Sequence, residues 1–517
     1  MAVRPPVDLV NLLSRKRVIP FVGAGFSAGL GLPGWNDLLE KVATDVLGHS
    51  DEDVDYERLY KDAGEDFLRV AEYLYVRSGG NIGPLRHAMS SVLRTDDETT
   101  DSSPHVELLN LGAPQVYTTN FDEMIEGTFY ALEQPVEVVV LPKDVAIADA
   151  RQTQVVKYHG DLRFDETLVV TESQYWSRLD FESPMDLKFR SDILGRSVLF
   201  MGYSFSDINI RVIWFKLMQM MRDVPEKDRL PSYIVRLDPN PVLEALFAEV
   251  GLRTIVLDPE GSAQTDSQKV DVLSDFLATL SSAASRDGKI PGTDQPMFAS
   301  KRLLTSLTEM WQTIGAGAVT PDVIERADTV FKRRVPAGLV DEARQLLVEV
   351  CKEPHYMALR LAPDIAKWGI DIWGPSDLLT SLAIRAFSGY GRAAILDREG
   401  VPWKELWSAH VSDEVAFQVI RDAEYELQYH ESSEYLDDDL AYQLDPVVRL
   451  ANGDLTTNNE VKERARQLVD KAAALYPAVA HYSPDSAGPP IPTSLLREIE
   501  MARSRQADAS SDERLED

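Results

Sequence analysis

Short apolar segments alternate with amphipathic segments through residues 1–285, and this alternation restricts the possible folds more than any other feature of the chain. Several of the apolar segments are rich in Val and Ile and end at Gly, Asn or Asp, as strands do. We expect strands at 17–22, 115–118, 136–141, 154–158, 197–201, 233–237 and 253–257. Strands that alternate with helices predict an α/β fold, a Rossmann-like parallel sheet with helices on both faces.

The segments between these strands have the period of helices. Residues 35–47 and 65–77 each place their apolar side chains on one face, which is typical of helices that cover a sheet. Residues 207–221 are apolar almost all round, which predicts a buried helix.

A change of pattern divides the chain. Residues 1–285 form the predicted α/β domain, and the polar segment 286–297, which contains Gly and Pro, has the composition of a linker. Strand patterns fade after it, and helical periodicity predicts a separate all-α domain over 298–481. The tail 482–517 is polar and is predicted to be disordered.

The chain is strongly acidic, with 53 Lys and Arg against 84 Asp and Glu and a net charge of −31. Such a surface repels phosphates, so direct binding of nucleic acid or of anionic membranes is not expected. The absence of a long apolar run and of a signal sequence predicts a cytoplasmic protein. A single cysteine, Cys351, excludes a four-cysteine zinc site within one chain, and no metal is expected.

The first candidate site is the glycine turn that follows the strand 17–22. It consists of Gly23, Ala24, Gly25, Phe26 and Ser27. Glycines directly after a strand let the backbone approach a phosphate, and a following helix would offer its free N–H groups. The hydroxyl of Ser27 is a further group that could donate a hydrogen bond to a phosphate oxygen. A turn needed only for packing is the alternative, because a lone Gly-x-Gly is weak evidence.

The second candidate site follows the strand 115–118. Asn120 offers a donor and an acceptor together, which suits an amide that holds a ribose hydroxyl and a water. Asp122 is a candidate anchor for a ribose hydroxyl, or it orients the loop. The alternative for Asn120 is that it caps the next helix.

The third candidate site is His159, which lies at the end of the strand 154–158 beside Gly160 and Asp161. A histidine in this place is suited to act as a general base near neutral pH. Asp161 either fixes the imidazole or caps a turn.

The fourth candidate site follows the strand 197–201. Gly202 permits a close approach of the backbone, and Ser204 supplies a hydroxyl. Like the other three sites, it lies at the carboxyl end of a predicted strand, where open α/β sheets bind ligands.

The order of these motifs resembles the sirtuins. The glycine turn continues to GLGLPGW, and TTNFD, KYHGD and GYS follow in the order of the family's motifs. After Pro33, protein-deacylating sirtuins usually continue with Asp-Phe-Arg. This chain has Gly34 and Trp35, as bacterial sirtuin-like NADases of antiphage defence often do. The resemblance covers residues 10–285 and does not extend to 298–517. A Thr-Glu-x-x-Tyr element at 171–175 also resembles the family and is assigned to architecture.

The resemblance implies NAD as the substrate, bound by residues 23–27, Asp122, Gly202 and Ser204, with Asn120 and His159 as catalytic residues. Without a zinc module to support a peptide cleft, water is the expected acceptor, which predicts an NAD⁺ glycohydrolase that releases nicotinamide and ADP-ribose. The alternatives are a zinc-independent deacylase or ADP-ribosyltransferase, or a non-catalytic NAD-binding regulatory subunit.

The resemblance also implies an antiphage effector that depletes NAD⁺ once a phage-derived trigger activates it. The helical domain would then serve oligomerisation, sensing or partner binding. A homo-oligomer is expected, and a helicase-like ATPase or an Argonaute is a candidate partner.

Overall fold

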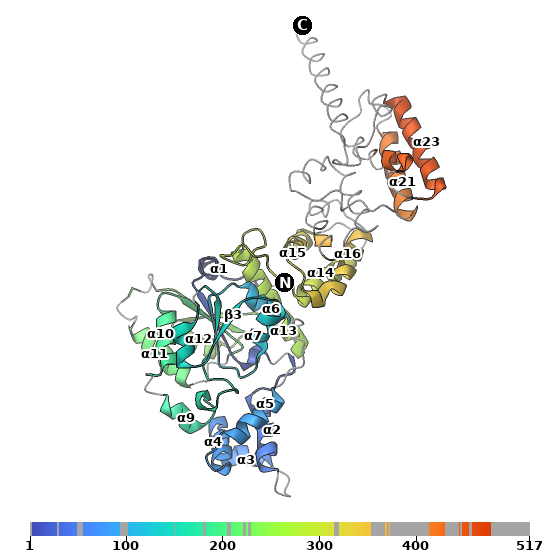
Figure 1. Ribbon diagram of the computed structural model, residues 1–517. Coiled ribbons are helices and arrows are strands. Elements are labelled where there is room, and N and C mark those ends of the chain that lie inside the picture. Colours follow the sequence, from blue (N-terminus) through green and yellow to red (C-terminus); the bar gives the residue numbers. More distant parts are fainter. Residues whose placement is uncertain are drawn as a thin grey trace. The chain divides into compact units, whose positions relative to one another are not determined.

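A computed structural model of the chain divides into two compact units, Met1–Leu303 and Leu304–Asp517 (Figure 1). The structure describes residues 3–27, 30–48, 55–93, 102–149, 151–178, 182–203, 208–220, 224–225, 229–314, 320–352, 365, 368–369, 372, 413–429, 444, 447–453 and 457–476.

The seven strands of the first unit form one parallel sheet in the order β3-β4-β2-β1-β5-β6-β7. The strands are β1 Val18–Val22, β2 Gln115–Thr118, β3 Val136–Val139, β4 Thr153–Lys157, β5 Ser197–Met201, β6 Ser232–Arg236 and β7 Leu252–Val256. Each predicted strand is present, with bounds that differ by no more than two residues, so the predicted fold class is confirmed.

Two layers of helices cover the sheet because alternate strand side chains point to opposite faces. In β1, Val18 and Val22 belong to one apolar cluster, whereas Ile19 and Phe21 belong to the other. The first cluster is closed by α1 Val7–Ser14, α6 Ser103–Asn110, α7 Met124–Ala131 and α13 Asp266–Ala284. The second is closed by α10 Pro184–Ile193, α11 Ile208–Met220 and α12 Pro241–Glu249. Burial on both faces explains why the strands are continuous apolar runs.

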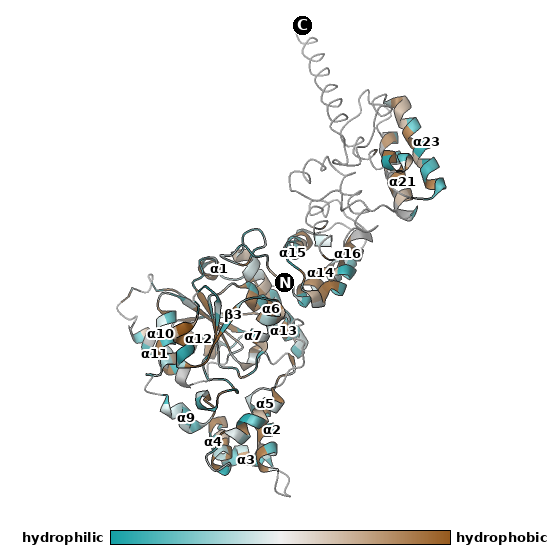
Figure 2. Ribbon diagram, in the orientation of Figure 1, coloured by the Kyte–Doolittle hydropathy of each residue, from teal (hydrophilic) through white to brown (hydrophobic). Residues whose placement is uncertain are grey.

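The prediction that residues 207–221 form a buried helix is wrong. In α11, Trp214 is 2% exposed, but its neighbour Phe215 is 58% exposed. The helix packs on the sheet through Trp214, whereas Phe215 is an apolar side chain at the surface. Figure 2 colours the ribbon by the hydropathy of each residue.

A helical module is inserted between β1 and β2. It consists of α2 Trp35–Leu47, α3 Tyr56–Asp62, α4 Phe67–Arg77 and α5 Gly83–Val92. These helices share an apolar cluster of their own, and Phe121, Leu168 and Val170 of the sheet edge join it. The module is therefore packed against the loops that follow β2 and β4.

The segment 286–297, interpreted from its composition as a linker, packs against the first unit. Ile290 and Met297 are buried in the cluster of α6 and α13, and the side chain of Asn110 accepts from the Phe298 N–H at 2.8 Å and donates to the Phe298 carbonyl at 2.9 Å. Two apolar anchors within a polar segment hold it in place, and the first unit extends to Leu303.

The second unit has helical elements where the structure describes it. They are α14 Lys301–Ile314, which begins in the first unit, α15 Pro321–Phe331, α16 Val340–Lys352, α21 Asp413–Tyr429 and α23 Asn459–Leu475. The side chain of Arg464 on α23 donates to Glu424 on α21 at 2.9 Å. The tail 482–517 lies outside the described residues. No helix within the described ranges combines the length and the apolar character that crossing a membrane requires.

Candidate active site

The glycine turn after β1 meets the turn after β5 at the carboxyl edge of the sheet. The Gly23 N–H donates to the Met201 carbonyl at 3.0 Å, and the Gly25 N–H donates to the Gly202 carbonyl at 2.9 Å. Gly202 has φ +60°, and a Cβ there would lie 2.1 Å from the Phe26 nitrogen. Only glycine fits this contact, so the two turns predicted separately form one backbone surface.

The strand order reverses at this place. The chain passes from β1 to β2 on one side of β1, and β5 lies on the other. Ligands of open α/β sheets bind at such a switch point. After β1 the backbone forms a short 3₁₀ turn, Ala24–Phe26, in place of the expected helix, and the next helix, α2, begins at Trp35.

Asn120 is held against the glycine turn. Its side-chain amide donates to the Gly23 carbonyl at 3.2 Å, and its backbone N–H donates to the Thr118 hydroxyl at 2.9 Å. The N-cap residue of α7 is Glu123, and the carboxylate of Asp122 before it accepts from the Met124 N–H at 3.1 Å. Asn120 therefore does not cap α7 and lies beside the turn.

His159 lies beside this asparagine motif. Thr118 of β2 pairs with Lys157 of β4, so Asn120 and His159 each stand two residues beyond a paired position. His159 is 2% exposed, and its Nδ1 lies 3.4 Å from the Tyr175 hydroxyl. Asp161 accepts from the backbone and side chain of Arg163 at 2.8–2.9 Å, which are the contacts of a turn cap and an ion pair.

A cavity of about 930 Å³ opens over these groups. Ala24, Gly25, Thr119, His159 and Gly202 form its floor. Its walls come from the start of α2, from residues 64–69 and from α9 Glu172–Ser177. Its volume lies in the upper part of the range of small-molecule sites, about 300–1,000 Å³.

Several predicted binding residues do not line this cavity. Phe26 and Ser27 are 1% exposed and face His105 of α6, with the Ser27 hydroxyl 3.4 Å from its Nε2. Gly23 and Asn120 are joined by a hydrogen bond beside the floor, and Asp122 bonds to the start of α7. Ser204 lies outside the described residues. Residues 26 and 27 therefore anchor the glycine turn in the core.

His105 gives this anchor a pH dependence. Burial lowers the pKa of His105 from 6.5 to about 3, so the folded protein holds it neutral. A depressed folded pKa contributes stability that is complete above pH 6.5 and is lost as the pH falls toward 3, because the unfolded chain then binds the extra proton. The expected slope is about 1.4 kcal/mol per pH unit. Urea denaturation between these pH values should show this slope for the native chain and a smaller one for His105→Gln. Equal slopes would contradict the assignment.

A buried ion pair supports the asparagine motif from below. The Lys157 ammonium, 0% exposed, donates to the Glu126 carboxylate at 2.9 Å and to the Asp122 backbone carbonyl at 2.5 Å. Burial by itself lowers the pKa of Lys157, but the nearby carboxylates of Glu126 and Asp122 outweigh it and raise the pKa above its ordinary value. Lys157 therefore stays charged and joins the strand of His159 to the loop of Asn120.

Sequence reasoning missed part of the cavity wall. Tyr175, assigned to architecture, lines the cavity and contacts His159, and Trp176, Tyr203 and Arg211 line it as well. The Arg69 guanidinium on α4 lies 3.6 Å from the Glu172 carboxylate on α9. The only sequence signal for Tyr175 was the Thr-Glu-x-x-Tyr element. Within the described ranges, no cluster of three or more His, Cys, Asp or Glu is arranged to hold a metal ion.

Comparison with known proteins finds a family model that matches part of the sheet. Residues 114–255, which run from β2 to β7 and include Asn120, His159 and Gly202, match the SIR2-like domain. The chain is 26% identical over 227 residues to the NAD(+) hydrolase ThsA of Bacillus cereus (strain MSX-D12), an alignment that covers 44% of each protein. It is 24% identical over 217 residues to the NAD(+) hydrolase ThsA of Cytobacillus dafuensis, covering 41% of this chain and 40% of that protein.

A third relative is Defense-associated sirtuin 2 of Bacillus subtilis, 25% identical over 274 residues, which are 51% of this chain and 25% of that protein. The chain thus matches less than half the length of each of these relatives. The matched family model and the observed sheet agree: residues 114–255 match the SIR2-like domain, and the chain is similar to bacterial NAD(+) hydrolases and to a defense-associated sirtuin.

Proposed function

We propose that this protein is an NAD⁺ glycohydrolase that cleaves NAD⁺ to nicotinamide and ADP-ribose, and that it acts as a bacterial antiphage effector. The observation that carries the proposal is the cavity over the joined turns, whose floor contains Gly25, Gly202 and His159 in a SIR2-like domain. The names of the relatives, NAD(+) hydrolase and defense-associated sirtuin, support the same activity and setting.

The cavity has the features that a dinucleotide requires. Gly25 and Gly202 carry no side chain, so a pyrophosphate can approach the backbone closely. Gly34 and Trp35 at the start of α2 line the cavity, and the free N–H groups of a helix's first turn favour an anion. Arg211 adds a positive charge, and Trp35, Trp176 and Tyr203 offer flat surfaces for the rings.

In the proposed reaction, the bond between the anomeric carbon and the nicotinamide nitrogen breaks, and the nicotinamide leaves as a neutral molecule with the bonding electrons. The ribose then has oxocarbenium character, as in glycoside cleavage generally. A water oxygen bonds to the anomeric carbon, and the water gives up one proton. Asn120 positions the ribose and the water, and His159 accepts a proton from the water or a ribose hydroxyl.

The helical second unit would provide oligomerisation, sensing or partner binding in this proposal. A homo-oligomer, and a partner such as a helicase-like ATPase or an Argonaute, agree with the family resemblance. A mass measurement of the native assembly, with NAD⁺ consumption assayed on the same sample, separates these arrangements.

The products distinguish this function from its rivals. The full-length chain is incubated with NAD⁺ over a range of protein concentrations, with and without acylated peptide, and the products are identified by mass spectrometry. Free ADP-ribose and nicotinamide in equal amounts, independent of the peptide, are the expected result. ADP-ribosylated or deacylated acceptors would indicate a transferase or a deacylase. NAD⁺ that binds but stays intact, both in the tube and in cells that express the chain, would indicate a regulatory subunit.

A further inference from the structure

A second cavity lies at the opposite edge of the sheet from His159. It has a volume of about 790 Å³, and residues at the amino ends of β1, β5, β6 and β7 line it. A strand of five residues spans about 16 Å, so the two cavities are separated by the length of the strands. The second cavity is therefore independent of the proposed NAD site.

Arginine is the prominent charged residue of this cavity. Four arginines line it among the described residues, against two glutamates, although acidic residues outnumber basic ones in the chain as a whole. Arg17, Arg196, Arg229 and Arg253 each stand at the beginning of a strand or within three residues before it. The parallel sheet brings these strand beginnings to one edge, so guanidinium groups far apart in sequence surround one space.

The observed partners of three of these arginines leave their charges available to a ligand. Arg17 donates to the Gly195 carbonyl at 2.7 Å, and no carboxylate within the described ranges pairs with it. Arg253 pairs with Asp8 at 3.1 Å, but both side chains are 61% exposed. The Arg196 guanidinium, whose side chain is 30% exposed, donates to the Asp192 backbone carbonyl at 3.2 Å and lies 3.8 Å from the Asp192 carboxylate. An exposed pair such as Arg253–Asp8 contributes little to stability, so a bound anion can replace Asp8 as the partner of Arg253.

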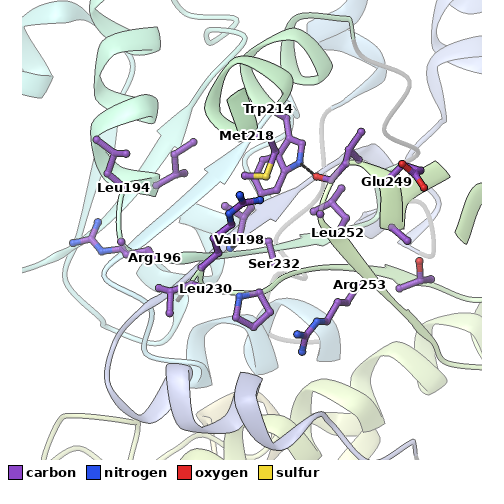
Figure 3. A pocket seen from close by; sticks show the side chains of 18 of the residues that line it. Leu194, Arg196, Val198, Trp214, Met218, Leu230, Ser232, Glu249, Leu252 and Arg253 are labelled. Atoms are coloured by element: carbon purple, nitrogen blue, oxygen red, sulfur yellow. Dashed lines mark hydrogen bonds between the residues drawn. The ribbon is translucent and has the colours of Figure 1, made fainter. Parts of the chain in front are cut away.

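An apolar wall faces the arginines. Trp214 and Met218 of α11 and Leu252 of β7 lie at the cavity, with Arg196 and Arg253 on opposite flanks in Figure 3. Trp214 is 2% exposed and is fixed by the hydrogen bond from its Nε1 to the Val250 carbonyl at 2.8 Å. The indole is therefore held in place at the cavity, and an apolar wall of this kind suits a flat apolar group rather than a bare ion.

A buried hydroxyl in the lining has no protein partner. Thr254 Oγ1 is buried and makes no hydrogen bond in the described structure, and Thr254 lines the cavity. A buried polar atom without a partner is uncommon and indicates that something else, a water or a ligand, satisfies it. This observation is independent of the arginines and points to the same space.

We infer that this cavity is a second ligand site, which binds a small organic phosphate of the size of a mononucleotide. The guanidinium groups of Arg17 and Arg196 bind the phosphate, because the planar fork of arginine matches phosphate oxygens. The wall of Trp214 and Met218 receives the apolar ring, and Thr254 bonds to a polar atom of the ligand.

The probe is adenosine monophosphate, with inorganic phosphate and adenosine measured separately by calorimetry on the full-length chain. The phosphate and the ring contact different parts of the cavity, so we expect AMP to bind more tightly than either fragment. Saturating ADP-ribose, which blocks the proposed NAD site, should leave AMP binding unchanged. AMP binding that ADP-ribose abolishes, or no saturable AMP binding at millimolar concentration, would overturn the inference.

Charge variants provide the matched comparison. Arg17→Gln and Arg196→Gln should each weaken AMP binding roughly tenfold or more, the loss typical of a hydrogen bond to a charged group. Arg58→Gln removes the same charge from an arginine on α3 whose side chain is 79% exposed and should have no effect. Thr254→Val keeps the shape of the side chain and reports on the site if the arginine variants fold poorly. It should weaken the binding of AMP but not that of inorganic phosphate. The site would be refuted if Arg17→Gln and Arg58→Gln lost AMP affinity equally. Unchanged AMP binding in Thr254→Val, Arg17→Gln and Arg196→Gln would refute it as well.

Discussion

Replacing His159 by alanine is expected to lower NAD⁺ turnover by about 10²–10⁴-fold, the usual contribution of a general base. His159 lines the cavity floor, is 2% exposed and touches Tyr175, so the change removes the imidazole from the proposed reaction centre. Asn120→Ala should cause a loss of similar size, because the amide lies beside the Gly23 carbonyl next to the same floor. Initial rates of ADP-ribose release by the full-length variants measure both effects.

Two controls separate loss of chemistry from loss of structure. His87→Ala removes an exposed histidine of α5 and should leave turnover unchanged. NAD⁺ binding by the two site variants, measured by calorimetry, should persist at reduced affinity. Full turnover in either site variant would remove that residue from the mechanism, and the joined glycine turns would remain as a binding surface only.

The second large effect is on stability. Lys157→Met should cost about 3–5 kcal/mol of unfolding free energy, the usual consequence of leaving one partner of a buried ion pair without its counter-charge. The group left without its counter-charge is the Glu126 carboxylate, which is 5% exposed. The double variant Lys157→Met/Glu126→Leu should regain most of that loss, because apolar side chains of similar volume often replace a buried pair at little cost. Urea denaturation of the three variants measures these differences.

Turnover shows whether Lys157 also positions the site. The double variant restores stability but not the hydrogen bond to the Asp122 carbonyl, so its kcat should stay below that of the native chain. Lys61→Met, on an exposed pair with Glu57 on α3, is the matched control and should cost less than about 1 kcal/mol. A double variant with native kcat would assign Lys157 to stability alone, and a single variant as stable as the control would refute the pair's role.

The strands could be predicted from the sequence because each is a short apolar run closed by a turn residue. The predicted α/β architecture followed from their alternation with helices. The helix at 35–47 was predicted with its observed bounds, since its polar and apolar faces differ clearly. Residues 207–221 were misjudged because an apolar composition does not show that one face of α11 remains in solvent.

The candidate site was predicted in part. The glycines and His159 follow strands, and parallel strands bring such positions to one edge, so His159, Gly25 and Gly202 could be found from the chain alone. The direction of a side chain could not be predicted: Ser27 faces His105 inside the core, and Asp122 accepts from the first N–H of α7. The cavity wall was missed because α4, α9 and α11 approach it only through tertiary packing. No local pattern marks Arg69 or Arg211.

The contact between Gly202 and Phe26 has a consequence for how this site can change. Because backbone atoms alone form that part of the floor, no substitution there can reshape the site without first separating two strand ends. Differences in ligand specificity between related chains must therefore come from the helices inserted between β1 and β2 and from α9, whose side chains can vary without disturbing the sheet. Related chains should differ most in the walls while the floor stays constant.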